Sequence, residues 1–129
     1  MNVEKISVAI DKNLLRRLEN EANRIGTNRS RIVQQALTDY LGENAPHNAE
    51  VIGILNLVYD EDAGNEIISI QHRFESEVIS SMHIHVNDKI CMEAVAVKGR
   101  RADLEQLAKA LSGAKGVKKV KLSVSLEVQ

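Results

Sequence analysis

The stretch Val78-Ile-Ser-Ser-Met-His-Ile-His-Val-Asn-Asp-Lys-Ile-Cys-Met-Glu-Ala-Val-Ala-Val97 decides how most of this chain folds. Polar and apolar residues alternate from Val78 to Val86, a pattern typical of a half-buried β-strand. A second strand is predicted from Ile90 to Val97. Asn87-Asp88-Lys89 lies between them and predicts a three-residue hairpin loop, in which Val86 pairs with Ile90.

Side chains that bind metals are concentrated in this hairpin. In the predicted register His85 faces Cys91 across the antiparallel pair and His83 faces Glu93, all on one side of the sheet. We expect the intervening apolar side chains to point the other way, into a core: Met82, Ile84 and Val86. Imidazole and thiolate bind late first-row divalent metals best, so the arrangement indicates a metal site.

A fourth ligand would have to come from elsewhere, and His72 is the candidate. It lies near the end of a predicted helix, Asp62 to Phe74, for which Asp62 is a possible N-cap. Taken singly, a strand histidine or cysteine is more often a solvated or core side chain than a ligand. Three of the four histidines and the only cysteine lie within twenty residues, however, which favours a metal site. The ligand types suit nickel, copper or zinc, and the angles that would choose among them are not given by sequence.

Around the hairpin, the pattern from residue 50 onward is strand, helix, strand, strand, helix, strand. The predicted elements are Glu50 to Tyr59, Asp62 to Phe74, Val78 to Val86, Ile90 to Val97, Arg101 to Ser112 and Val117 to Val128. A four-stranded sheet with both helices on one face, the ferredoxin-like arrangement, is the expected solution for this order. We expect the open face of the sheet to carry the histidines.

Residues 1–42 show a different pattern. Lys5 to Ile10 alternates as a short strand, and a helix follows that Asp11 caps and Gly26 ends. A second helix is predicted from Ser30 to Leu41. Its expected buried face consists of Ile32, Val33, Ala36, Leu37, Tyr40 and Leu41. The chain is therefore divided into residues 1–42, a polar linker at 43–49 with the only proline, and residues 50–129.

One strand and two helices bury too little surface to fold alone, and a lone strand has two unpaired edges. Two copies that pair their strands antiparallel would solve both problems and leave Lys5, Ser7 and Ala9 exposed on a ribbon that fits the DNA major groove. This order resembles the ribbon-helix-helix repressors. The resemblance implies that Arg29 and Ser30, at the start of the second helix, contact a DNA phosphate.

Composition limits the classes of protein that fit. No apolar run approaches the ~20 residues of a membrane span, and there is no hydrophobic signal region, so we expect a cytoplasmic protein. A single cysteine cannot form an internal disulfide and leaves the thiol free for ligation. The net charge of −1 gives no overall nucleic-acid signature. Residues 1–42 nevertheless carry seven basic against five acidic residues, the sign expected of a DNA-binding head.

The whole chain resembles the nickel-responsive transcriptional regulators, which join a ribbon-helix-helix head to an ACT-like metal-binding domain. The motif that carries the resemblance is Gln71-His72, His83-Ile-His85, Asn87, Cys91-x-Glu93 and Val97-Lys-Gly99. The resemblance implies an α+β protein that is not an enzyme and binds one Ni(II) per chain. It implies that His83, His85 and Cys91 ligate nickel with His72 of the facing subunit, and that Glu93 orients a ligand histidine.

The same resemblance implies the partners: a homotetramer built as a dimer of dimers, a palindromic double-stranded operator, and repression of nickel-uptake genes. Two other classes remain open from the residues. A ribbon-helix-helix repressor could sense copper, zinc or a small metabolite through its ACT-like domain. A metalloenzyme would need an open coordination position and a general base, for which Glu93 is the available residue.

Overall fold

The computed structural model describes residues 2–128, so the first residue of the first predicted domain and the last of the second lie outside the described part. The chain divides into two compact units, Met1–Leu37 and Thr38–Gln129. The division falls inside helix α2 (Arg29–Glu43), which includes the first residue of the predicted linker. No helix in the described range is both long and apolar enough to span a bilayer.

The first unit contains helix α1 (Lys12–Ile25) and the start of α2. The Asp11 side chain accepts the N–H groups of Asn13 and Leu14 at 3.0 and 3.1 Å, which confirms it as the N-cap. Gly26 ends α1 with φ +72°, a left-handed conformation in which glycine carries no Cβ penalty. Asn28 Oδ1 accepts the N–H of Arg31 at 2.9 Å in the first turn of α2.

The predicted strand from Lys5 to Ile10 is not formed in the single chain, where residues 2–10 have no regular secondary structure. The expected buried face of α2 is also largely exposed, and Ala22 is the only buried residue described in the first unit. Its exposed large apolar residues are Val3, Ile6, Val8, Ile10, Leu14, Ile25, Val33 and Leu37. The physical reason is that both predictions depend on a second copy, which would supply the missing strand neighbour and cover the helices.

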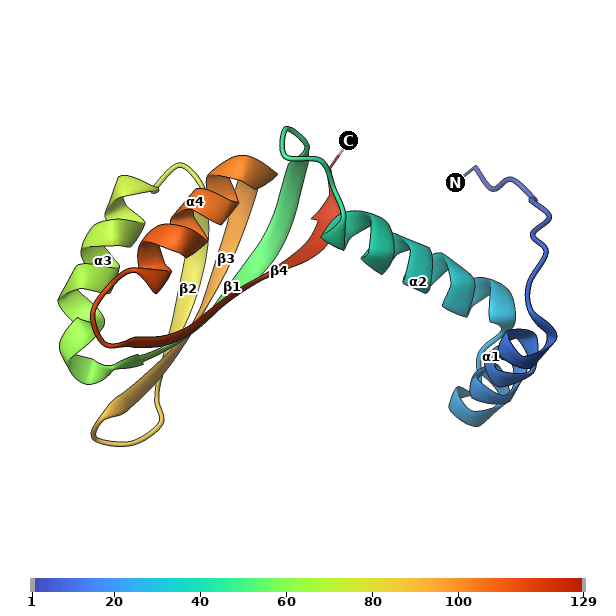
Figure 1. Cartoon of the computed structure of the whole chain (residues 1–129), viewed down its shortest axis with the longest axis horizontal. Helices are drawn as coiled ribbons and strands as arrows, with labels where there is room; N and C mark the ends of the chain where they lie inside the picture. Colours follow the sequence, from blue (N-terminus) through green and yellow to red (C-terminus); the bar gives the residue numbers. More distant parts are fainter. Residues whose placement is uncertain (1, 129) are drawn as a thin grey trace. The chain divides into compact units, whose positions relative to one another are not determined.

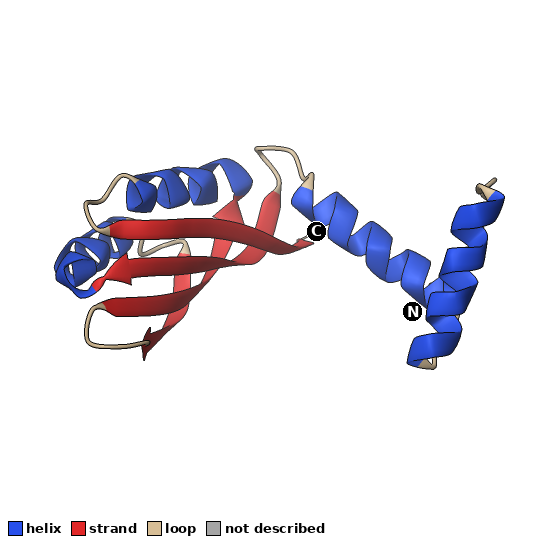
Figure 2. Ribbon diagram, turned by 60° about the horizontal axis from the view of Figure 1, so that its bottom comes forward, coloured by secondary structure: helices blue, strands red, loops and turns tan. Residues whose placement is uncertain are grey.

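The second unit has the predicted β-α-β-β-α-β order. Its elements are β1 (Glu50–Asp60), a 3-10 turn (Glu61–Ala63), α3 (Gly64–Arg73), β2 (Val78–His85), β3 (Ile90–Arg100), α4 (Arg101–Ser112) and β4 (Val117–Glu127). The strands form one antiparallel sheet in the order β2-β3-β1-β4. Both helices lie against the same face of this sheet (Figures 1 and 2), as the ferredoxin-like prediction requires.

The core lies between that face and the two helices. Helix α4 contributes Leu104, Leu107 and Leu111, which recur at helical spacing and are fully buried. Helix α3 adds Ile67 and Ile70. The strands contribute alternate residues, because successive strand side chains point to opposite faces: Val51, Leu55, Leu57 and Tyr59 from β1, and Cys91, Val95 and Val97 from β3.

The predicted cap of α3 is wrong. Asp62 lies inside the 3-10 turn, and α3 begins two residues later at Gly64, with Ala63 at the N-cap position and no side-chain cap. The chain leaves β1 through this tight turn, whose N–H at Gly64 donates to the carbonyl of Glu61. Backbone bonding within the turn therefore starts the helix without a capping side chain.

Candidate functional site

The hairpin of β2 and β3 has the predicted register. His85 pairs with Cys91 and His83 with Glu93, and the N–H of Val86 donates to the carbonyl of Ile90 at 2.9 Å. The loop is fixed by Asn87, whose Oδ1 accepts the N–H groups of Lys89 and Ile90, both at 2.9 Å. An asparagine that bonds the backbone two and three residues on is a common way to hold a tight turn. The register of the candidate site is thus set locally.

The structure brings three of the predicted ligands together. One candidate donor atom each from His83, His85 and Cys91 lies within 4.8 Å of the other two. Cys91 Sγ is 3.6 Å from His85 Nδ1, and the two imidazole rings are 4.8 Å apart between centroids. Cys91 is only 2% exposed, whereas both histidines are exposed. The site therefore has a buried thiol at its base and two accessible imidazoles above it.

The prediction that the open face of the sheet carries the histidines is wrong. Cys91 alternates with Glu93, Val95 and Val97 along β3 on the face that packs against the helices. Residues directly opposite on paired strands share a face, so His85 and His83 also belong to the helix side.

The prediction that the intervening apolar residues of β2 point into the core is consequently also wrong. Met82 and Val86 are 60% and 56% exposed, and Ile84 is half-buried. The alternation in β2 correctly predicted which residues share a face of the strand. However, β2 is an edge strand of the sheet, and its apolar side is the one without helices. Strand alternation alone cannot show which face the rest of the chain covers.

Glu93 is a buried carboxylate beside the three candidate ligands. Tyr59 Oη donates to Glu93 Oε1 at 3.0 Å, and Gln71 Nε2, from α3, donates to Glu93 Oε2 at 2.8 Å. Tyr59 Oη also lies 3.5 Å from His83 Nε2. A network of hydrogen bonds therefore runs from His83, a candidate ligand, through Tyr59 at the end of β1 and Glu93 on β3 to α3, the helix that carries His72.

Sequence reasoning did not single out Tyr59. The sequence feature that could have identified Tyr59 is an aromatic residue with a hydroxyl group at the end of a predicted strand, in a chain whose predicted site contains a carboxylate. Burial raises the pKa of Tyr59 well above its ordinary value, and the hydrogen bond to Glu93 and the charges of Glu93 and Cys91 act in the same direction. The hydroxyl is thereby kept protonated, so that it can donate to Glu93.

His72 is not brought to the other three ligands within the described chain. Its side chain is 81% exposed, and its Nδ1 lies 3.7 Å from Glu75 Oε2. The grouped candidate ligands contain His83, His85 and Cys91 but not His72. One chain supplies three of the four predicted ligands at one place and carries the fourth on an exposed helix position.

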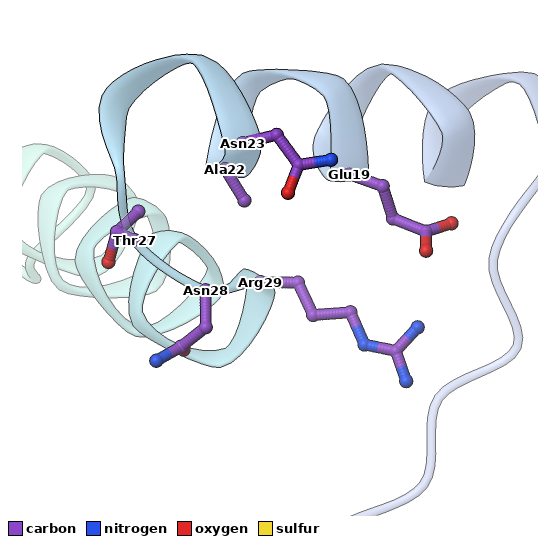
Figure 3. A pocket seen from close by; sticks show the side chains of 6 residues that line it. All are labelled: Glu19, Ala22, Asn23, Thr27, Asn28 and Arg29. Atoms are coloured by element: carbon purple, nitrogen blue, oxygen red, sulfur yellow. The ribbon is translucent and has the colours of Figure 1, made fainter.

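The predicted DNA-binding residues are all exposed. Lys5, Ser7 and Ala9 lie in the segment without secondary structure, and Arg29 and Ser30 form the start of α2. A hollow of about 210 Å³ lies at the turn between the two helices. Figure 3 shows its lining, with Glu19, Ala22 and Asn23 on the α1 side and Thr27, Asn28 and Arg29 at and after the turn. Arg29 extends from the first turn of α2, in which Asn28 accepts the N–H groups of Arg31 and Ile32.

Comparison with known proteins assigns both parts of the chain. The family model described as the ribbon-helix-helix protein, copG family, matches residues 4–43. The model described as the NikR C-terminal nickel-binding domain matches residues 52–125. The chain is thus of the class that joins a ribbon-helix-helix head to a metal-binding domain of α+β fold.

Whole-chain relatives narrow this class. The chain is 44% identical to a protein of Saccharolobus solfataricus and 42% identical to one of Saccharolobus islandicus, over 97% of this chain and 96% of each relative. A Pyrococcus abyssi protein is 32% identical over 95% of this chain and 93% of its own length. All three are described by their names as nickel-responsive regulators. The chain belongs to the nickel-responsive regulator family.

A solved structure resembles part of this chain in fold. An uncharacterized protein of Thermotoga maritima superposes with a TM-score of 0.54 and 19% identity, over 58% of this chain and 96% of that one. At this identity the likeness concerns the fold alone.

Proposed function

We propose that this chain is a nickel-dependent DNA-binding transcriptional regulator that represses nickel-uptake genes when Ni(II) fills a site shared by two subunits. The observation that carries the proposal is the set of donor atoms of His83, His85 and Cys91 within 4.8 Å of one another, in a chain of this family. The protein then acts by binding in the cytoplasm rather than as an enzyme.

The donor set fits the metal. Two imidazole nitrogens and one thiolate sulfur suit Ni(II), Cu(II) and Zn(II), and family membership favours nickel among them. His83, His85 and Cys91 would hold the ion, one per chain. Nickel bound there would supply coordinate bonds that join two subunits.

The fourth ligand would be His72 of the partner subunit. His72 is exposed on α3 and lies outside the group of three, so it is free to meet a site in another chain. If two subunits face each other about a two-fold axis, each completes the site of the other, and neither site exists in a single chain. Pairs of this kind would build the proposed homotetramer, a dimer of dimers.

The head would bind DNA as a dimer. The exposed apolar residues on its helices and the unpaired 5–10 segment both favour pairing with a second copy. Lys5, Ser7 and Ala9 of each copy would then face the bases of a palindromic operator, and Arg29 and Ser30 would contact a phosphate.

Helix α3 would take part in the coupling between the nickel site and the DNA-binding head. When His72 joins the partner's ligands, α3 is held in place, and Gln71 on the same helix holds Glu93 beside the ligands of its own chain. DNA affinity rises only to the extent that this ordered arrangement favours the DNA-binding form. By the same linkage, DNA must raise the affinity of the chain for nickel.

A mixing experiment tests the shared site. Apo-protein is titrated with Ni(II), and the visible charge-transfer and ligand-field bands are recorded for the wild type and for His72→Ala and Cys91→Ala. Each variant alone should lack the four-ligand spectrum. When the variants are unfolded together and refolded, half of the random pairs are mixed and each mixed pair has one intact site of two, so about a quarter of the wild-type signal should return.

Other results would contradict the proposal. If the mixture regains no signal although the wild type binds nickel, the two ligands are not contributed by different subunits. If the wild type binds no nickel and Cu(II) or a metabolite raises its DNA affinity instead, the alternative ribbon-helix-helix sensor replaces the nickel regulator.

A further inference from the structure

The segment that joins α2 to β1 is attached to the start of α4 in the second unit. Arg101 Nη1 donates to the carbonyl of Ala45 at 2.6 Å, and Arg101 Nε donates to Glu105 Oε1 at 3.0 Å. The other oxygen of Glu105 lies 3.2 Å from His47 Nδ1. A single arginine and a single glutamate thus connect two residues of the 43–49 segment to α4.

Backbone bonds reinforce this attachment. The N–H groups of Arg101 and Ala102 donate to the carbonyls of Ala49 and His47 at 3.0 and 2.9 Å. The N-cap residue of α4, Arg100, makes no capping bond with its side chain. The first N–H groups of a helix need acceptors, and here the joining segment provides them. The segment is therefore the N-terminal cap of α4 as well as a connection.

The end of α2 belongs to the same packed region. Ala45 is buried in the core cluster of the second unit, and Gly42 lies against Val124, where an added Cβ would be 3.7 Å from the valine side chain. Ser123 Oγ donates to Glu43 Oε1 at 3.5 Å. Residues 42–49 are thus fixed from both sides, on β4 and on α4.

Arg100 and Arg101 are adjacent but differ in what they contact. Arg100 donates through Nε and Nη2 to Asp103, two bonds within α4, and its side chain is 58% exposed. The Arg101 side chain is 20% exposed and is the one that reaches Ala45. Of these two arginine side chains, that of Arg101 contacts the segment that follows α2, whereas the bonds of Arg100 stay within α4.

We propose that Arg101 is a positioning residue that makes the 43–49 segment a rigid extension of the metal-binding unit, so that nickel binding in this unit is transmitted through the end of α2 to the DNA-binding head. The inference rests on the proposed function. It differs from the sequence prediction, in which residues 43–49 form a polar linker between two domains. Without Arg101, nickel would still bind but would no longer favour the DNA-binding form.

The test compares Arg101→Met with Arg100→Met in the full-length chain. The two variants are matched because each removes one guanidinium from adjacent positions and keeps a long side chain. Three properties are measured: nickel titration, hydrogen exchange at the Ala102 amide, and affinity of the nickel-loaded protein for a duplex that the wild type selects from a random-sequence pool. Since bonds to charged groups are the stronger ones, Arg101→Met should speed Ala102 exchange and weaken DNA binding by on the order of tenfold or more. Nickel binding by Arg101→Met should match that of the wild type, and this match would also show that the metal-binding unit of the variant is folded. Arg100→Met should resemble the wild type in all three properties.

Two results would overturn the proposal. The first is Ala102 exchange in Arg101→Met that matches Arg100→Met, because the segment is then held without Arg101. The second is faster exchange with unchanged nickel-dependent DNA affinity, because a loosened segment then transmits as well as a fixed one. Failure of the wild type to bind nickel would instead count against the proposed function, and Ala102 exchange would still show whether Arg101 holds the segment.

Discussion

Replacing Tyr59 by phenylalanine tests whether the buried network beside the ligands stabilises the metal-binding unit. The Tyr59 ring is 1% exposed, and phenylalanine fills the same space without the hydroxyl. Glu93 Oε1 then loses the donor that lies 3.0 Å away and keeps only Gln71 on its other oxygen. Hydrogen bonds to charged groups contribute about 1.5–3 kcal/mol, so we expect the free energy of unfolding to fall by about that amount at pH 8.

The same change should alter how stability depends on pH. The pKa of Tyr59 is raised in the folded protein, mainly by burial, whereas in the unfolded chain the tyrosine ionises near pH 10. Above that pH the unfolded chain loses a proton that the folded chain retains, which favours unfolding. The wild type should therefore lose about 1.4 kcal/mol per pH unit above pH 10 relative to Tyr59→Phe, in which this group is absent.

Urea unfolding of nickel-free protein at pH 8, 10 and 11, followed by circular dichroism at one protein concentration, measures both effects. Tyr40→Phe is the matched control, because Tyr40 is the other tyrosine of the chain and is exposed. The reasoning fails if Tyr59→Phe is no less stable than Tyr40→Phe at pH 8. It also fails if the difference between wild type and Tyr59→Phe does not narrow between pH 10 and 11.

Three further changes test the ligands and the head. Cys91→Ser should remove the nickel charge-transfer band while the circular dichroism spectrum stays that of the wild type, and a retained band would exclude Cys91 as a ligand. Lys5→Ala should lower affinity for the selected duplex and reduce the salt dependence by about one counterion per copy of the head, with unchanged nickel titration. A large loss of nickel binding would refute the division of labour between the two parts. Leu37→Asp puts a charge on an exposed apolar position of α2, and sedimentation should show a smaller assembly that no longer binds DNA, whereas an unchanged mass would argue against pairing through this face.

Local sequence signals predicted the hairpin well, because its register depends on nearby residues alone. Asn87 fixes the loop, and the loop fixes His85 opposite Cys91. The caps of α1 were equally predictable, since Asp11 and Gly26 act on N–H and C=O groups within a few residues. Asp62 failed as a cap because a 3-10 turn formed by the backbone displaced the start of α3.

Predictions that depended on distant packing were less successful. The alternation in β2 separated His83 and His85 from Met82 and Val86, but which side meets the helices is decided by β1, β3 and the two helices together. Tyr59 and Gln71 lie 34 and 22 residues before Glu93, and only the fold brings them to its side chain. The strand predicted at Lys5 to Ile10 would need a partner strand from a second copy, and it is not formed in the single chain.

The division of burial within the candidate site supports the proposal that two subunits share it. Cys91 is enclosed by the core and Glu93 beside it is held by two donors, so this side of the site is already built in one chain. His83 and His85 are exposed at the edge strand of the sheet, and His72 is exposed on α3, so the remaining side is left open to another molecule. A preformed half with fixed ligands lowers the ordering cost of binding, while an open half makes completion depend on association. Under this proposal nickel binding strengthens subunit association, and subunit association strengthens nickel binding to the same extent. Dilution of the protein should therefore weaken nickel binding, even though three of the proposed ligands lie in one chain.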